Sequence, residues 1–251
     1  MRTDGQGGAL GGRLTGFGGV VAVALCIATA AVGYQGGPVT VGGAIAGTVR
    51  FAGSPPPRGT LEVTKDVAVC GASAKLANDL VVGPDGGVAN AVVRLREIAA
   101  GKPFADGQPT LDQRGCEYLP HVVLVPVGQP LTILNPDGIL HNIRTVGSGP
   151  AGNPPLNRAQ PKFKTSMVQV FDRPEFIRVA CDVHRWMQAW IVVQDHPYYA
   201  VTDGQGRFDL AAVPPGTYEL VFWHEMLGEV TRPVTVNAGG RAVVDVTLGA
   251  P

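Results

Sequence analysis

The sequence predicts an all-β fold with two β-sandwich units. Glycine and proline are abundant, with 35 and 21 of 251 residues, which is typical of chains with many turns. Short runs that alternate apolar and polar residues are separated by these turn residues. Apolar residues at helical spacing are scarce after the N-terminus. Many short strands and few helices are therefore expected.

Charge excludes one class of function. Lys+Arg and Asp+Glu both number 20, so the formal net charge is zero. A nucleic-acid-binding protein usually carries a basic surface, and nothing in this composition predicts one. Hydrophobic residues make up 45% of the chain, which is enough for one large core or two small ones.

Residues 1–33 are predicted to be a signal peptide or an N-terminal anchor. Arg2 and Arg13 precede an apolar run that extends to about Tyr34, and Ala28-Thr29-Ala30 has the small-x-small pattern of a cleavage site. The alternative is an uncleaved membrane anchor, since the run is just long enough to span a bilayer. We expect a periplasmic or extracellular protein that contacts the membrane only if this segment is retained.

The predicted strands follow in order along residues 44–195, which we interpret as the first unit. Each is a short alternating run next to a turn signal, as at Asp85-Gly86. The runs are AIAGTVRFAG, LVVGPDGGVANAVVRLRE, HVVLVPVGQPLTILNPDG, SMVQVFD, EFIRVAC and AWIVVQ. The second unit, residues 196–250, contains two hairpins, with turns at Asp203-Gly204 and at a Pro-Pro-Gly sequence. An alternative assigns AGTVRFAGSPPP to this second sandwich.

A metal site is predicted on the loop CDVHRWM. Cys181, His184 and Met187 are soft or borderline ligands between two strands, and a mononuclear copper site of this kind needs a second histidine. His141, after the strand PLTILN, is the candidate. Asn142 follows it and is expected to hold the two ligand segments together by hydrogen bonds.

These segments, VGQPLTILNPDGILHNI and RVACDVHRWMQAWIVVQ, resemble the cupredoxins of the amicyanin/plastocyanin group. The resemblance covers roughly residues 80–195 and implies a Greek-key β-sandwich with one mononuclear Cu(I)/Cu(II) ion. It implies that His141, Cys181, His184 and Met187 are the copper ligands. Residues 44–79 and 98–110 are extra to the family pattern. Zinc binding, or a fold without its metal, are the alternatives.

With Cys181 assigned to copper, Cys70 and Cys116 remain in the exported part of the chain. An oxidising compartment favours a disulfide between them, and two buried free thiols are the alternative. The C-terminal run AVTDGQGRFDLAAVPPGTYELVFWHE resembles carboxypeptidase regulatory-like domains. That resemblance implies a small transthyretin-like β-sandwich and says little about function.

The expected function is to carry single electrons between a redox donor and a redox acceptor protein. An enzyme is not expected, because the five histidines include no His-x-His pair and no Gly-x-Ser-x-Gly motif occurs. Trp186, beside His184, is predicted to contact the partner, or else to pack between the two units. The alternatives are an envelope binding or scaffold protein whose cupredoxin domain is structural or stores copper, and an electron-delivery subunit.

Overall fold

The chain is almost entirely β-sheet, as predicted. The computed structural model describes residues 33–147, 149 and 151–249, so nearly all of the predicted signal segment, residues 1–33, lies outside the described residues. The described part holds twenty strands and one four-residue helix, α1 (Val67–Cys70). No helix among the described residues has the length and apolar character needed to cross a membrane.

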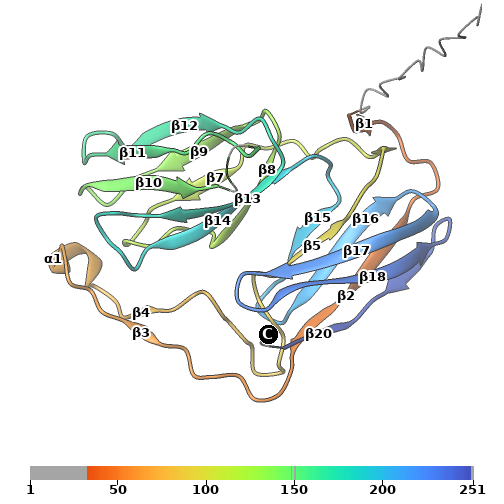
Figure 1. Ribbon diagram of the computed structural model, residues 1–251, viewed down its shortest axis with the longest axis horizontal. Helices are drawn as coiled ribbons and strands as arrows, with labels where there is room; N and C mark the ends of the chain where they lie inside the picture. The colour runs from red at the N-terminus through yellow and green to blue at the C-terminus, as the bar shows by residue number, and fades with distance from the viewer. Residues whose placement is uncertain (1–32, 148, 150, 250–251) are drawn as a thin grey trace, which may run out of the picture. The chain divides into compact units, whose positions relative to one another are not determined.

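The first sandwich is formed by two sheets from residues 110–194 (Figure 1). One sheet has the order β11 (Asn157–Gln160), β10 (His141–Val146), β13 (Glu175–Ala180), β14 (Gln188–Gln194) and β8 (Val122–Pro126). The other has the order β12 (Ser166–Val170), β9 (Pro130–Leu134) and β7 (Thr110–Asp112). Alternate residues such as Leu131 and Ile133 on β9 are buried, because successive side chains point to opposite faces of a strand.

The second sandwich uses strands from both ends of the chain. One sheet has the order β15 (Tyr199–Val201), β5 (Val92–Leu95), β17 (Gly216–His224) and β18 (Gly228–Val236). The other has the order β16 (Arg207–Val213), β2 (Gly43–Phe51) and β19 (Arg241–Val243), and β20 (Val246–Leu248) also pairs with β2. Its core includes Ile45, Leu95 and Phe222.

Sheet pairing therefore divides the chain differently from the predicted ranges 44–195 and 196–250. Strands β2 and β5 lie in the first predicted range but pair with strands after residue 198. The alternative assignment of AGTVRFAG to the second sandwich agrees with this pairing. Alternation along a strand indicates the strand itself and does not indicate its partner.

Between β2 and β5 the chain leaves the second sandwich and returns to it. This excursion carries the short hairpin of β3 (Thr60–Leu61) and β4 (Lys75–Leu76), with α1 between its two strands (Figure 1). Val63 and Val69 pack against the core of the first sandwich. We call residues 60–76 the capping segment, because it covers one end of the first sandwich.

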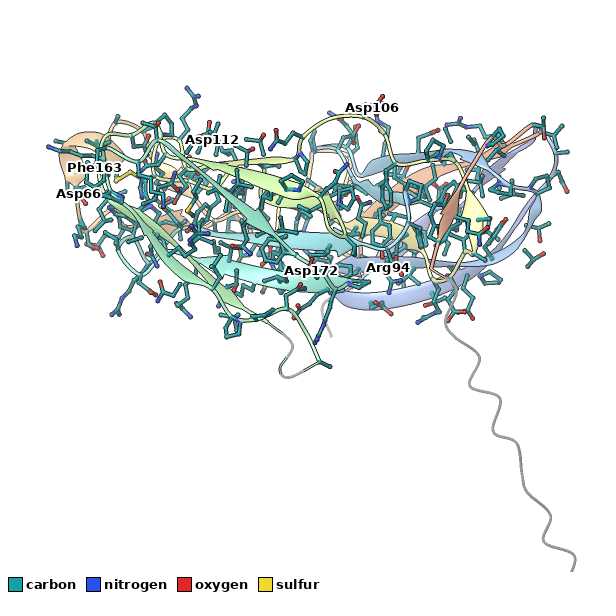
Figure 2. All side chains as sticks on the ribbon, turned by 90° about the horizontal axis from the view of Figure 1, so that it is seen from above. Asp66, Arg94, Asp106, Asp112, Phe163 and Asp172 are labelled. Carbon is teal, nitrogen blue, oxygen red and sulfur yellow. A yellow bond between two sulfur atoms is a disulfide. The ribbon has the colours of Figure 1, made fainter. Side chains whose placement is uncertain are left out.

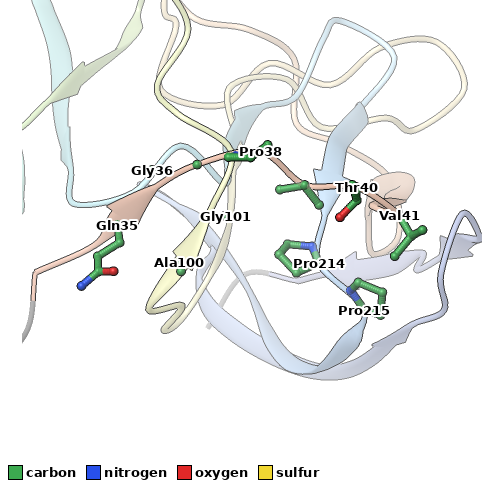
Figure 3. Close-up of a pocket in the computed structure, with 11 residues that line it drawn as sticks. Gln35, Gly36, Pro38, Thr40, Val41, Ala100, Gly101, Pro214 and Pro215 are labelled. Carbon is green, nitrogen blue, oxygen red and sulfur yellow. The ribbon is translucent and has the colours of Figure 1, made fainter.

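The described N-terminal residues lie against the second sandwich. Strand β1 (Gln35–Gly36) pairs in parallel with β6 (Ala100–Gly101). Residues 35–41 line a pocket of about 430 Å³ together with Pro214 and Pro215 (Figure 3). The pocket contains no charged side chain and no histidine or cysteine, and we assign it no chemistry.

Two buried histidines at the second sandwich are held in the neutral form. Nδ1 of His196 accepts the backbone N–H of Tyr198, and Nδ1 of His224 accepts that of Met226, both at 3.2 Å. A proton on either Nδ1 would break these bonds. Burial is also the main cause that lowers the pKa of both side chains below the usual 6.5.

This arrangement predicts how stability depends on pH. The unfolded chain gains protons near pH 6.5 and the folded chain resists them, so the free energy of unfolding should fall as the pH decreases below about 6.5. Above about pH 7 these two groups should have no effect. Urea unfolding at pH 7.5, 6.5 and 5.5 measures the slope, and the double variant His196→Gln, His224→Gln should flatten it. An equally steep slope in that variant would contradict the assignment.

Candidate metal centre

Three of the predicted ligands meet in the first sandwich. His141 begins β10, Cys181 directly follows β13, and His184 lies on the loop to β14. One ligand atom from each lies within 4.8 Å of the others. The two histidine Nδ1 atoms are 3.0 Å apart, and Cys181 Sγ is 3.9 Å from His184 Nδ1. All three residues are at most 2% exposed.

The loop that carries Cys181, His184 and Met187 is closed by its own hydrogen bonds. The backbone N–H of His184 donates to Cys181 Sγ at 3.4 Å, and that of Met187 donates to the His184 carbonyl at 2.9 Å. The Cys181 N–H donates to the Met187 carbonyl at 3.3 Å, next to the β13–β14 pair of Ala180 and Gln188. Met187 is buried in the same core cluster as Cys181. Short spacing between two paired strands thus fixes where these side chains lie.

Asn142 connects the two ligand-bearing segments. Its Oδ1 accepts the backbone N–H of Asp182 at 2.7 Å and the Cys181 thiol at 3.3 Å. Its Nδ2 donates to Asn157 Oδ1 at 2.9 Å, and its carbonyl accepts the Tyr118 hydroxyl at 2.5 Å. Asn142 therefore holds the two segments together by hydrogen bonds, as predicted from its place after His141.

A carboxylate contacts the outer nitrogen of each histidine, and neither carboxylate was predicted. Asp137 Oδ2 lies 3.0 Å from His141 Nε2, and Asp66 Oδ2 lies 2.8 Å from His184 Nε2. Such contacts keep the hydrogen of a neutral imidazole on Nε2 and leave the Nδ1 lone pair free for a metal. Asp137 precedes His141 by four residues, so the segment NPDGILH contains a local sequence signal for the Asp137–His141 contact. Asp66 is distant from His184 in sequence, and no local sequence signal indicates their contact.

Asp137 also anchors a neighbouring loop. Its two carboxylate oxygens accept the backbone N–H groups of Gly115 and Cys116, each at 2.7 Å. Burial is the largest influence on His141 and lowers its pKa, although the hydrogen bond to Asp137 opposes this effect. His141 is therefore neutral and able to offer Nδ1 as a ligand near neutral pH.

Cys70 and Cys116 form a disulfide, as the sequence analysis predicts, and Cys181 remains a free buried thiol. Trp186 lies next to this bridge. It is half-buried, its ring centroid is 5.1 Å from that of His184, and its Nε1 donates to the Cys116 carbonyl at 3.1 Å. Trp186 packs against the core of the first sandwich, which differs from the predicted alternative of packing between the units.

The donor set fits a copper ion. Two imidazole nitrogens and a sulfur converge in a buried space, and the two Nδ1 atoms lie 3.0 Å apart. That arrangement is favourable when a cation lies between the two nitrogens, or when one of them carries a hydrogen that it donates to the other. Two imidazoles, a thiolate and a thioether on the same loop are a ligand set that copper prefers. A thioether is not among the usual ligands of zinc.

Comparison with known proteins identifies the C-terminal part. Residues 187–249 match the carboxypeptidase regulatory-like domain. The resemblance predicted for this part is therefore confirmed. The matched range of the carboxypeptidase regulatory-like domain contains β14 of the first sandwich and β15 to β20 of the second. The second sandwich adds β2 and β5 from earlier in the chain. A search of curated proteins finds no match to this chain.

Similar solved structures include amicyanins, which belong to the cupredoxin group that the sequence resembles. The reduced Cu(I) form of an amicyanin variant is 25% identical and covers 36% of this chain and 86% of its own, with a TM-score of 0.32. A second Cu(I) amicyanin variant is 21% identical, with coverages of 41% and 98% and the same TM-score. A copper-containing nitrite reductase from Thermus scotoductus is 19% identical, with coverages of 40% and 25% and a TM-score of 0.32.

Proposed function

We propose that the chain is an exported protein, and not an enzyme, that binds one copper ion and carries single electrons between redox proteins. His141, Cys181 and His184 are the proposed strong ligands and Met187 the weak fourth. The observation that carries the proposal is the convergence of two Nδ1 atoms and one sulfur in a buried space. A copper ion held there supplies a Cu(I)/Cu(II) couple.

Hydrogen bonds from this chain's residues would keep the ligand geometry nearly the same in the two oxidation states of the copper ion. Asn142 fixes Cys181 from the side of β10, and the carboxylates of Asp66 and Asp137 orient the two histidines. Ligand positions set by paired strands and hydrogen bonds move little, which keeps the reorganisation for electron transfer low. The surrounding core excludes water from the thiolate.

The proposed partner surface lies beside the capping segment. A groove of about 500 Å³ runs past Asp66, Leu140, Phe163 and Val183, and Phe163 is 82% exposed. Figure 2 shows Asp66 and Phe163 at the same end of the molecule. Leu140 in the same groove is 43% exposed, and neighbouring exposed apolar side chains are typical of an interaction site. The predicted contact through Trp186 is less accessible, because that ring is half-buried.

Metal loading and a visible spectrum test the proposal. We expect the purified protein to bind one equivalent of copper and to show an intense copper–thiolate absorption band when oxidised. Cys181→Ser should abolish the band and leave the far-ultraviolet circular dichroism unchanged. His224→Gln, a buried histidine outside the site, is the matched control and should keep the band. A wild-type protein without the band after copper loading would refute the proposal.

Copper storage is the second candidate function. The observation that favours it is the burial of both histidines, since His184 is 0% exposed beneath Asp66. A storage site would load fully and show no reversible couple in voltammetry, whereas a carrier would show one. Voltammetry of the copper-loaded protein therefore separates the two candidates.

A further inference from the structure

The capping segment brings one charged side chain to the metal centre. Asp66 belongs to neither sandwich sheet, yet its Oδ2 lies 2.8 Å from His184 Nε2. That hydrogen bond is the only one the described residues give this carboxylate. His184 is fully buried, and the Asp66 side chain is 36% exposed, so the carboxylate covers the outward nitrogen of the ring.

The backbone conformation of Asp66 directs its carboxylate toward His184. Asp66 has a φ of 50° and is the residue before α1. This left-handed conformation is uncommon except for glycine, and Asp and Asn tolerate it best among the others. The Asp66 carbonyl accepts the N–H groups of Val69 and Cys70, both at 2.9 Å. The turn that follows therefore holds Asp66 in this conformation.

The rest of the capping segment is fixed to the first sandwich. Cys70, four residues after Asp66, forms the disulfide with Cys116. Both cysteines are 0% exposed and belong to the core cluster, against which Val63 and Val69 also pack. Asp66 is thus held over the metal centre by a covalent bond and by packing on both sides of it in sequence.

We infer that Asp66 is a positioning residue of the metal centre, which fixes the hydrogen of His184 on Nε2 and lowers the reduction potential of the bound ion. The inference rests on the proposed function. With Nε2 bonded to the carboxylate, His184 presents Nδ1 toward His141. The negative charge stabilises Cu(II) more than Cu(I), because Cu(II) carries one more positive charge.

Substitutions of Asp66 distinguish the effect on the His184 tautomer from the effect on the reduction potential better than substitutions of Asp137 would. Asp137 also binds two backbone N–H groups of the loop at Gly115 and Cys116, so its replacement would disturb that loop. Asp66→Asn keeps the shape, the tolerance for positive φ and an oxygen acceptor, but it removes the charge. Asp66→Ala removes both the charge and the acceptor. Asp106→Asn, at an exposed carboxylate, is the matched control.

The first measurement uses the metal-free protein. Nitrogen NMR of the histidine rings should show His184 with its hydrogen on Nε2 in the wild type and in Asp66→Asn, and a mixture of both tautomers in Asp66→Ala. This readout does not require copper. If the protein proves not to bind copper, NMR still decides whether Asp66 positions His184. An unchanged tautomer in Asp66→Ala would overturn that part of the inference.

The second measurement uses the copper-loaded protein. Asp66→Ala should weaken copper binding by about 10- to 100-fold, as is typical when the carboxylate partner of a ligating histidine is lost. Asp66→Asn should shift the preference from Cu(II) to Cu(I) by about tenfold, which raises the potential by about 59 mV for a one-electron couple. A potential that matches the wild type and Asp106→Asn would overturn the electrostatic role.

Discussion

Replacing both Cys70 and Cys116 by alanine is expected to lower the free energy of unfolding by about 4 kcal/mol. The two cysteines are 46 residues apart in sequence, and a disulfide that closes a loop of this length restricts the unfolded chain by about that amount. Both sulfurs lie in the core of the first sandwich, so their loss also removes packing. Urea unfolding of the metal-free protein, with the wild type beside the double variant, measures the difference.

The same experiment can be run on the wild-type chain with a dithiol reductant. Reduction should lower the urea midpoint of the wild type and leave that of the double variant unchanged. Cys181→Ala is the control, because it removes the free thiol and keeps the disulfide, and it should remain sensitive to the reductant. A wild-type midpoint that does not respond to complete reduction would contradict a stabilising role for this disulfide.

The positions of the candidate metal ligands could be predicted because their placement is mostly local. Cys181, His184 and Met187 lie on one short loop, and the alternating strands on either side of it fix that loop between β13 and β14. His141 could be predicted from its place after the strand PLTILN, and it begins β10 in the structure. Strand β10 then pairs with β13, which brings His141 to the end of the sandwich where the loop lies.

The capping segment and the strand partners could not be predicted in this way. Asp66 reaches His184 across 118 residues of sequence, and no spacing rule connects them. Strand β2 has the same alternating pattern as strands of the first sandwich, yet it pairs with β16, β19 and β20. An alternation with a period of two residues indicates which face of a strand is buried. It does not indicate which sheet that face packs against.

Glu225→Ala is expected to destabilise the folded chain by about 3 kcal/mol or more. The Glu225 carboxylate is hydrogen-bonded to His121 Nε2, and it accepts the Trp190 Nε1–H at 2.9 Å. Side-chain exposure is only 10% for Glu225 and 6% for His121. Hydrogen bonds to a charged group contribute about 1.5–3 kcal/mol each, and the buried His121 and the partly buried Trp190 would both lose their partner.

Glu225 follows β17 of the second sandwich, whereas His121 and Trp190 belong to the first, so this carboxylate links the two cores. Glu219→Ala, on the strand that Glu225 follows, is the matched control. Glu219 pairs with Arg96 at 2.6 Å, but its side chain is 60% exposed, and an exposed ion pair contributes at most about 1 kcal/mol. Glu225→Gln keeps an oxygen that accepts the Trp190 N–H. Its loss of unfolding free energy, measured with urea, should lie between those of Glu225→Ala and Glu219→Ala. Equal losses in Glu225→Ala and Glu219→Ala would show that the buried carboxylate does not hold the two sandwiches together.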